Sequence, residues 1–182
     1  ALAMLASVRK PWVRWPLMAW VDFFRAFPPL VLLIFLYAGL PFAGLELGGF
    51  ACVCIAFFPT TGAYYGEILR AGIHSVPAGQ AEAARALGHS YIGSMRYVML
   101  PQAVRNAIPA LMNHSVSLFK NSSLAMAIGV AELTHAVKEI ENQSFRAFET
   151  YLLATVTYLA FSLLIMVVGA WLARRVRIAG AR

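Results

Sequence analysis

Four long apolar intervals run along the chain with almost no charged residues. They cover residues 26–45, 47–66, 106–131 and 150–173, and only the third contains a charge, Lys120. A helix that crosses a membrane needs about 20 predominantly apolar residues. The pattern therefore predicts an all-α, polytopic membrane protein with four complete transmembrane helices, centred near Ile34, Ala56, Leu118 and Leu163.

The chain before the first interval has a different character. Residues 1–8 are apolar but too short to span a bilayer, so we interpret them as the tail of a missing first span, which would make five in the intact fold. Residues 11–27 mix three tryptophans with arginine and aspartate, a combination that favours a helix lying at the membrane interface. Residues 1–182 are expected to form a single transmembrane domain.

Composition and charge agree with this placement in a membrane. The chain is 60% hydrophobic and 13% charged, whereas a soluble domain has about 45–50% apolar and about 25% charged residues. Most of the basic residues fall in three clusters, within 9–25, 70–105 and 174–182. Basic loops stay in the cytoplasm, which predicts that these clusters and the C-terminus lie inside, and that Glu46 and residues 132–149 lie outside. Each cluster ends an apolar run, so this charge does not indicate nucleic-acid binding.

The longest inner segment, residues 71–106, is expected to contain two short helices. The alanine-rich run 81–87 favours a helix that Gly88 ends. Ser90 is placed to cap a second helix that Pro101 closes. In the first helix, Ala81, Ala84 and Gly88 are expected to share a face of small residues that can seat in a groove.

The third apolar interval carries an unusual number of polar residues. Asn113, Ser117 and Lys120 share one helical face, and Asn121 lies beside Lys120. A cation at mid-membrane costs about 2.5–3.5 kcal/mol, so it usually faces the bundle interior or water. These four residues could line a path and attract an anionic carboxylate. Alternatively, Lys120 pairs with carbonyl groups at the helix end or extends outward to the membrane surface.

Other polar residues in the spans favour structural roles. His114 is expected to be a packed polar residue instead of a metal ligand. Glu67 and Arg70, three residues apart, are expected to pair with each other or with a partner subunit. Cys52 and Cys54 point in different directions on a helix, so they cannot jointly hold a metal or form a disulfide.

The inner segment resembles a known motif. Residues 82–101 read Glu-Ala-Ala, three residues, Gly88, nine residues, Val98, one residue, Leu100-Pro101. This resembles the cytoplasmic loop of permease subunits in ATP-binding-cassette (ABC) importers, whose pattern is E-A-A-x(3)-G-x(9)-I-x-L-P, and Val98 is the one departure. Residues 67–80 are similar to the polar amino acid subgroup of these permeases. Residues 119–123 and 128–133 are similar to its glutamate/aspartate branch, and the likeness covers essentially the whole chain.

The resemblance implies a permease subunit in the bacterial cytoplasmic (inner) membrane that imports polar amino acids, with glutamate or aspartate favoured. In the family this loop docks onto a separate ABC ATPase, which carries the ATP and Mg²⁺. A second permease subunit, identical or homologous, and a periplasmic or extracellular amino-acid-binding protein complete the implied partners, with membrane lipid around them. Residues carried over to the ATPase-coupling role are Glu82, Ala83, Ala84, Gly88, Leu100 and Pro101.

The chain itself is expected to have no catalytic residue, metal or cofactor. Its sequence contains no glycine-rich phosphate loop that ends in Lys-Ser or Lys-Thr, so ATP hydrolysis must belong to another polypeptide. The alternatives are an integral membrane enzyme and an ATP-independent channel. An enzyme would need a catalytic cluster at membrane depth, whereas the serines near His114 spread around their helix. A channel gives no reason for the inner motif.

Overall fold

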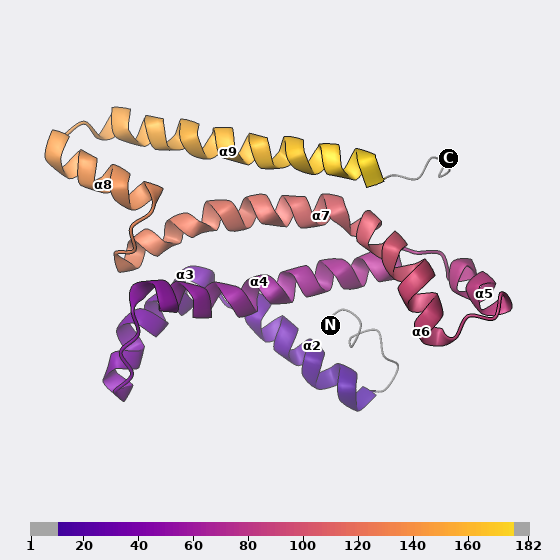
Figure 1. Cartoon of the computed structure of the whole chain (residues 1–182). Helices are drawn as coiled ribbons and strands as arrows, with labels where there is room; N and C mark the ends of the chain where they lie inside the picture. Colours follow the sequence, from indigo (N-terminus) through magenta and orange to yellow (C-terminus); the bar gives the residue numbers. More distant parts are fainter. Residues whose placement is uncertain (1–10, 177–182) are drawn as a thin grey trace.

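Every regular element of the described residues is a helix, as predicted. The computed structural model describes residues 11–176, so residues 1–8, interpreted as a span remnant, lie outside the described residues. The elements labelled in Figure 1, with four tighter or wider helical segments named η, are listed in chain order: α2 (Pro11–Ala26), α3 (Pro29–Ile34), η1 (Phe35–Gly39), η2 (Leu40–Ala43), α4 (Gly49–His74), α5 (Ala78–Ala86), α6 (Tyr91–Gly93), η3 (Ser94–Met99), α7 (Leu100–Asn121), η4 (Ser122–Ile128), α8 (Leu133–Ser144) and α9 (Ala147–Val176).

Helix α7 lies between α4 and α9 (Figure 1). Its contact with α4 is very close, because a methyl group at Gly72 would lie 2.5 Å from the carbonyl oxygen of Ala103. On the other side of α7, a methyl group at Gly169 of α9 would lie 2.6 Å from Cγ of Met112. Small residues that allow such close approach are the usual means of packing helices in membranes.

A buried hydrophobic core joins α3, α4 and η4. Leu33, Cys52, Ala56 and Ile128 are buried together there. Cys52 is buried and Cys54 is exposed, and both thiols are free. The prediction that the two cysteines point apart is therefore confirmed, and Cys52 acts as a small apolar side chain in the core.

The chain bends by 90° between α2 and the helical run Pro29–Ala43. Phe27 and Pro28 each precede a proline, and a residue before proline avoids the α-helical conformation. Pro28 is accordingly extended, and α2 ends at Ala26. The predicted helix over 11–27 is thus observed as Pro11–Ala26, while its position at the membrane interface stays a prediction. Gly44, with a φ of 78°, ends the run that follows.

The predicted number of four complete spans is not confirmed. Within residues 11–176, α9 alone is both long and apolar enough to cross a membrane, with a mean hydropathy of 2.2. Residues Trp15–Ala26 and Pro29–Ala43, which are separated by the 90° bend, are long and apolar enough to cross a membrane only when they are counted as one span. Pro29–Ala43 is too short by itself for a span of about 20 residues.

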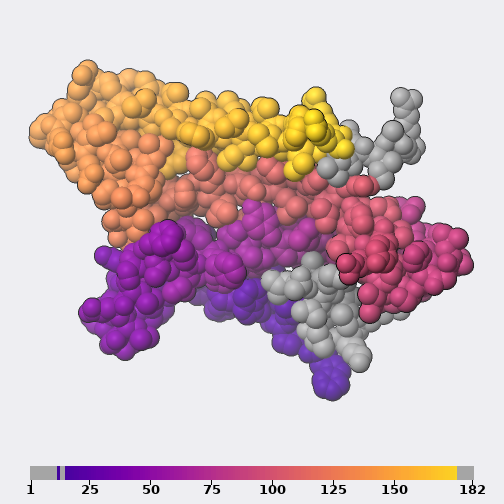
Figure 2. Space-filling view, viewed as in Figure 1, coloured from indigo at the N-terminus to yellow at the C-terminus, as the bar shows by residue number. Residues whose placement is uncertain are grey.

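Much of the apolar surface is left uncovered by the chain's own packing. Only 17% of the most apolar stretch of α9 is buried. In the space-filling view, α9 covers one side of α7 and leaves its own outer side open (Figure 2). Such a surface suits contact with lipid or with another subunit.

Candidate coupling surface and polar membrane face

The inner segment is held at both ends by hydrogen bonds between α4 and α7. The Ser75 hydroxyl donates to the Gly72 carbonyl oxygen at 2.7 Å and accepts from the Asn106 side-chain amide at 2.8 Å. Further along, the Gln102 side-chain amide donates to the side-chain oxygen of Gln80 at 3.3 Å. These bonds connect the start of the segment to its end.

A small hydrophobic core fixes the segment onto the same two helices. Ile73, Val76, Met99 and Ala103 are buried together, with Ala81 packed against them. Because this core contains residues of α4, the loop and α7, we expect the segment to move with both helices as one body.

Gly88 terminates helix α5 two residues after Ala86, as predicted. Gly88 has a φ of 86°, a left-handed conformation that glycine adopts without a steric penalty. The His89 amide donates to the Ala84 carbonyl at 3.1 Å, and the Gly88 amide donates to that of Arg85 at 3.0 Å. This pair of bonds is the Schellman arrangement that closes a helix and reverses the chain.

The predicted outward face of small residues is wrong for Ala84. Its side chain is 3% exposed and packs inside the chain, because this side of α5 faces η3. Ala81 is half-buried for the same reason. Of the remaining residues carried over to the coupling role, Leu100 is half-buried, and the exposed ones are Glu82, Ala83, Gly88 and Pro101.

The second helix of the segment begins as predicted but does not end at Pro101. The Ser90 hydroxyl accepts from the Gly93 amide at 3.2 Å and so caps α6. The helical path then continues through the wider turns of η3 directly into α7. Pro101 lies in the first turn of α7, where a missing N–H donor costs little, so it does not break the path.

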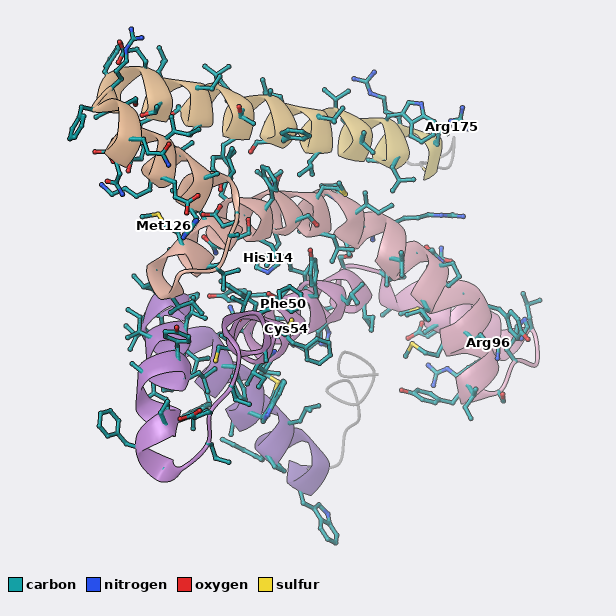
Figure 3. The ribbon with its side chains drawn as sticks, turned by 60° about the vertical axis from the view of Figure 1, so that its left-hand side comes forward. Phe50, Cys54, Arg96, His114, Met126 and Arg175 are labelled. Atoms are coloured by element: carbon teal, nitrogen blue, oxygen red, sulfur yellow. The ribbon has the colours of Figure 1, made fainter. Side chains whose placement is uncertain are left out.

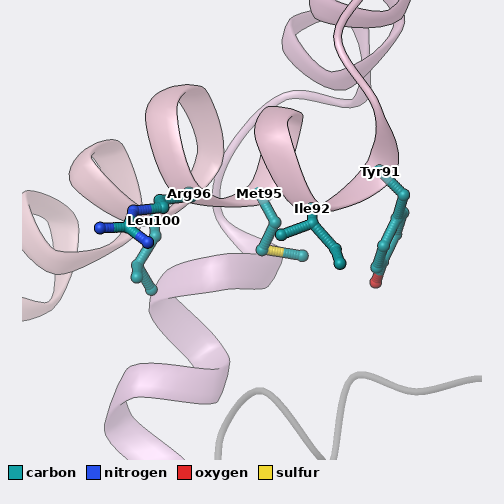
Figure 4. Close-up of a pocket in the computed structure, with 5 residues that line it drawn as sticks. All are labelled: Tyr91, Ile92, Met95, Arg96 and Leu100. Carbon is teal, nitrogen blue, oxygen red and sulfur yellow. The ribbon is translucent and has the colours of Figure 1, made fainter.

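An exposed apolar area lies beside Gly88, and we name it the coupling surface. It consists of Leu87, Tyr91, Ile92 and Tyr97, whose exposed fractions are 82%, 66%, 75% and 68%. Next to it is a groove of about 360 Å³ lined by Tyr91, Ile92, Met95, Arg96 and Leu100 (Figure 4). Several large exposed apolar side chains on one short segment favour a contact with another protein.

These apolar residues are not among those that the sequence motif predicts. The motif pattern directs attention to its fixed positions, whereas Leu87, Tyr91 and Ile92 occupy its variable ones. A signal was nevertheless present, because large apolar side chains are unexpected in a loop that water would otherwise surround.

The four candidate path residues lie together on one side of α7. Asn113, Lys120 and Asn121 are exposed and Ser117 is half-buried, with its hydroxyl donating to the Asn113 carbonyl at 3.2 Å. Helix α7 runs from Leu100 to Asn121, so Lys120 lies in its last turn. The third span was predicted to be centred near Leu118. The middle of α7 lies earlier in the chain, because the helix begins at Leu100, before the apolar interval that starts at residue 106.

His114, which is labelled in Figure 3, packs against two tyrosines of α4. Its ring centroid lies 4.9 Å from that of Tyr64 and 5.0 Å from that of Tyr65. The Tyr65 hydroxyl lies 2.7 Å from that of Ser115, on the next residue of α7. The expectation of a packed polar histidine is confirmed, and within residues 11–176 no group of three or more His, Cys, Asp or Glu residues could hold a metal.

Glu67 and Arg70 form a two-point ion pair within α4, as predicted. The guanidinium donates to the two carboxylate oxygens at 2.8 Å and 2.5 Å. This fork geometry is the strong form of the arginine–carboxylate interaction. The pair therefore stabilises the C-terminal end of α4.

Glu132 joins helix α8 to α9. Its carboxylate accepts from the amides of Thr134 and His135 at 2.9 Å and 2.8 Å, which caps α8. The Tyr158 hydroxyl donates to the same carboxylate at 2.9 Å. Residues 132–149, predicted to lie outside, thus contain the helix α8, while their position outside the membrane stays a prediction.

The chain is similar to a known family of membrane transport proteins and to several of its members. Residues 1–178 match the model of a family described as binding-protein-dependent transport system inner membrane component. The probable amino-acid ABC transporter permease protein YckA of Bacillus subtilis is 41% identical over 81% of this chain and 66% of its own length. The glutamine transport system permease protein GlnP of Escherichia coli K12 is 36% identical over 88% of this chain and 74% of its own length.

Solved structures show the same fold. An amino acid ABC transporter crystallised with histidines matches with a TM-score of 0.88 and 33% identity, over 96% of this chain and 81% of that one. The methionine ABC transporter MetNI in an inward-facing conformation matches with a TM-score of 0.82 at 20% identity, over 97% of this chain and 85% of that one. The chain thus spans about two thirds to three quarters of the length of the curated relatives described above.

Proposed function

The chain belongs to the family of inner membrane components of binding-protein-dependent transport systems, and on this premise we propose that it imports polar amino acids. Its relatives are permease subunits of ABC transporters, which are not enzymes themselves, and the ATPase is a separate subunit. The names of relatives that refer to amino acids, glutamine and octopine support the substrate class.

The observation that carries the proposal is the coupling surface on a firmly anchored loop. Leu87, Tyr91 and Ile92 are exposed beside Gly88, while the loop beneath them shares a core with α4 and α7. An ABC ATPase that seats on this surface and closes upon binding ATP and Mg²⁺ would move both helices together. The chain's own part is to receive that movement and transmit it to the membrane.

The polar side of α7 is the proposed translocation path. Asn113, Ser117, Lys120 and Asn121 lie there, and no other element of residues 11–176 covers Asn113, Lys120 or Asn121. A second permease subunit, identical or homologous, would face this side and complete the path. An amino-acid-binding protein outside the membrane would deliver the substrate to it.

The experiment that tests the coupling surface is capture of the ATPase. The full-length permease gene is expressed with its candidate ATPase, and the complex is purified in detergent. Replacing Ile92 by glutamate should reduce co-purification by roughly tenfold or more, because a charge would be buried at the centre of an apolar contact. The matched control is Ile140→Glu, at an exposed isoleucine of α8 far from the loop. Equal capture by Ile92→Glu and the wild type would refute the docking surface.

Glutamate or aspartate is the finer substrate that we propose, from the sequence resemblance at residues 119–133 and from Lys120. Lys120→Ala should raise KM for acidic amino acids by about tenfold, since a hydrogen bond to a charged group contributes about 1.5–3 kcal/mol. Uptake of neutral amino acids and co-purification of the ATPase should stay at the wild-type level. Competition assays with glutamate, aspartate and glutamine measure this difference.

The control for Lys120 is Lys138→Ala. The hydrogen bond from Lys138 to Glu141, 2.7 Å long, raises the pKa of this outer lysine and holds it away from the proposed path. Unchanged kinetics for acidic substrates in Lys120→Ala would remove Lys120 from the path, and equal effects of both variants would indicate a general loss of positive charge.

A further inference from the structure

The outer side of α9 carries an apolar stripe that ends in two arginines. Leu164, Val167, Val168 and Trp171 follow the spacing i, i+3, i+4, i+7 and are 55%, 66%, 49% and 52% exposed. Arg174 and Arg175 continue the stripe at three and four residues beyond Trp171, and both are exposed. Gly169, which packs against Met112 of α7, lies on the opposite side of α9.

The two arginines have no acidic partner among residues 11–176. Arg25, Arg70 and Arg146 each form an ion pair with a carboxylate three residues away. Arg174 and Arg175 take part in no such pair within the described part of the chain, and residues 150–182 contain no aspartate or glutamate at all. These two adjacent positive charges at the end of an apolar helix are therefore available to attract an anion from outside the chain.

Arg175 is held in place by Trp171. Its guanidinium carbon lies 4.3 Å from the centroid of the indole ring, which is a cation–π contact. Arg175 is thus kept at the end of α9, at the boundary between its apolar side and its basic end (Figure 3). Tryptophan is enriched at membrane–water interfaces, and arginine is enriched just beyond the cytoplasmic ends of spans.

We propose that the outer side of α9 binds an anionic phospholipid. Its acyl chain would lie along Leu164, Val167 and Val168, and its phosphate would accept hydrogen bonds from Arg174 and Arg175. Arginine suits this role, because its planar donors match the oxygens of a phosphate. The apolar stripe distinguishes this site from one for a free anion, since a headgroup without acyl chains would gain nothing from it.

The test is the amount of phosphatidylglycerol that stays with the purified transporter complex. The permease and its ATPase are extracted together from membranes that contain phosphatidylglycerol and phosphatidylethanolamine, and the retained lipids are quantified by mass spectrometry. Each basic residue near an anionic lipid surface contributes roughly fivefold in affinity, so Arg174→Gln/Arg175→Gln should retain much less phosphatidylglycerol. Retention of phosphatidylethanolamine should not change.

Matched variants separate this site from general charge effects. Arg146→Gln removes an arginine at the other end of α9, where Glu149 already pairs with it at 2.9 Å, and should retain phosphatidylglycerol normally. Arg174→Lys/Arg175→Lys keeps the charge and should retain most of it. If the double glutamine variant fails to insert, Arg175→Gln alone should show the roughly fivefold loss.

Three results would overturn the proposal. One is equal retention of phosphatidylglycerol by the wild type and the glutamine variants. Another is an equal loss in Arg146→Gln. The third is release of phosphatidylglycerol by inorganic phosphate at a matching concentration, which would show that the arginines bind a small anion and that the apolar stripe is not used.

Discussion

Gly88→Asp is expected to abolish uptake while the permease still inserts into the membrane. Gly88 is exposed, and nothing lies within 4 Å of the position that its Cβ would take, so the free chain has room for the side chain. The φ of 86° is one that L side chains rarely adopt, so the substitution strains the turn, and aspartate is among the residues that tolerate this region best. The loss arises when the ATPase covers the coupling surface.

The magnitude follows from burying an unpaired charge. Leaving one uncompensated charge in a contact costs about 3–5 kcal/mol, which corresponds to more than about a hundredfold in ATPase affinity. Uptake of labelled amino acid in cells and the amount of permease in the membrane fraction are measured together. Normal uptake by Gly88→Asp would exclude Gly88 from the coupling contact.

Gly79→Asp is the matched control for this prediction. Gly79 also lies on α5, is exposed and has no neighbour within 4 Å of its Cβ position, but it does not have the left-handed φ of Gly88. An acidic side chain in the first turn of a helix is favourable. Gly79→Asp should therefore transport nearly as well as the wild type, and an equal loss would mean that any negative charge on α5 blocks uptake.

Gly72→Ala is expected to destabilise the fold itself. The added methyl group would lie 2.5 Å from the Ala103 carbonyl oxygen and 3.1 Å from Cβ of Ala107. The nearer atom belongs to the backbone, so α4 and α7 must move apart, and overpacking of this kind costs about 1–3 kcal/mol. Thermal unfolding in detergent and the amount of inserted protein measure the effect.

Gly62→Ala isolates that clash. Gly62 is in the same helix, and nothing lies within 4 Å of the position that its Cβ would take. Both variants gain the same helix propensity, about 1 kcal/mol, so Gly62→Ala should be neutral or stabilising. The close α4–α7 contact would be refuted if Gly72→Ala were as stable as Gly62→Ala.

Much of the fold could be predicted from the apolar intervals and the turn residues. The last interval, 150–173, lies inside α9, and Gly88 ends α5 as its position in the motif indicates. The absence of catalytic function in this chain was also predicted, and the permease relatives confirm it. In these cases a local property, hydropathy or backbone freedom, decides the outcome.

Other features depend on contacts that a linear pattern does not contain. Ala84 fits both an outward and an inward face of α5, and only the packing of η3 makes it inward. Pro101 usually ends a helix, but the wider turns of η3 let the helical path pass through it. The run after Pro29 is apolar for long enough to span, yet the bend and the turn at Gly44 limit its helical length.

The anchoring of the inner segment to the first turns of α7 has a geometric consequence. Lys120 follows Leu100 by 20 residues, so the two lie about 30 Å apart along the helix axis at a rise of 1.5 Å per residue. A tilt of about 5° around the inner end would thus displace Lys120 by about 3 Å, close to the diameter of a water molecule. Under the proposed coupling, α7 would act as a lever arm, in which a slight rotation at the loop produces a larger displacement at the far end.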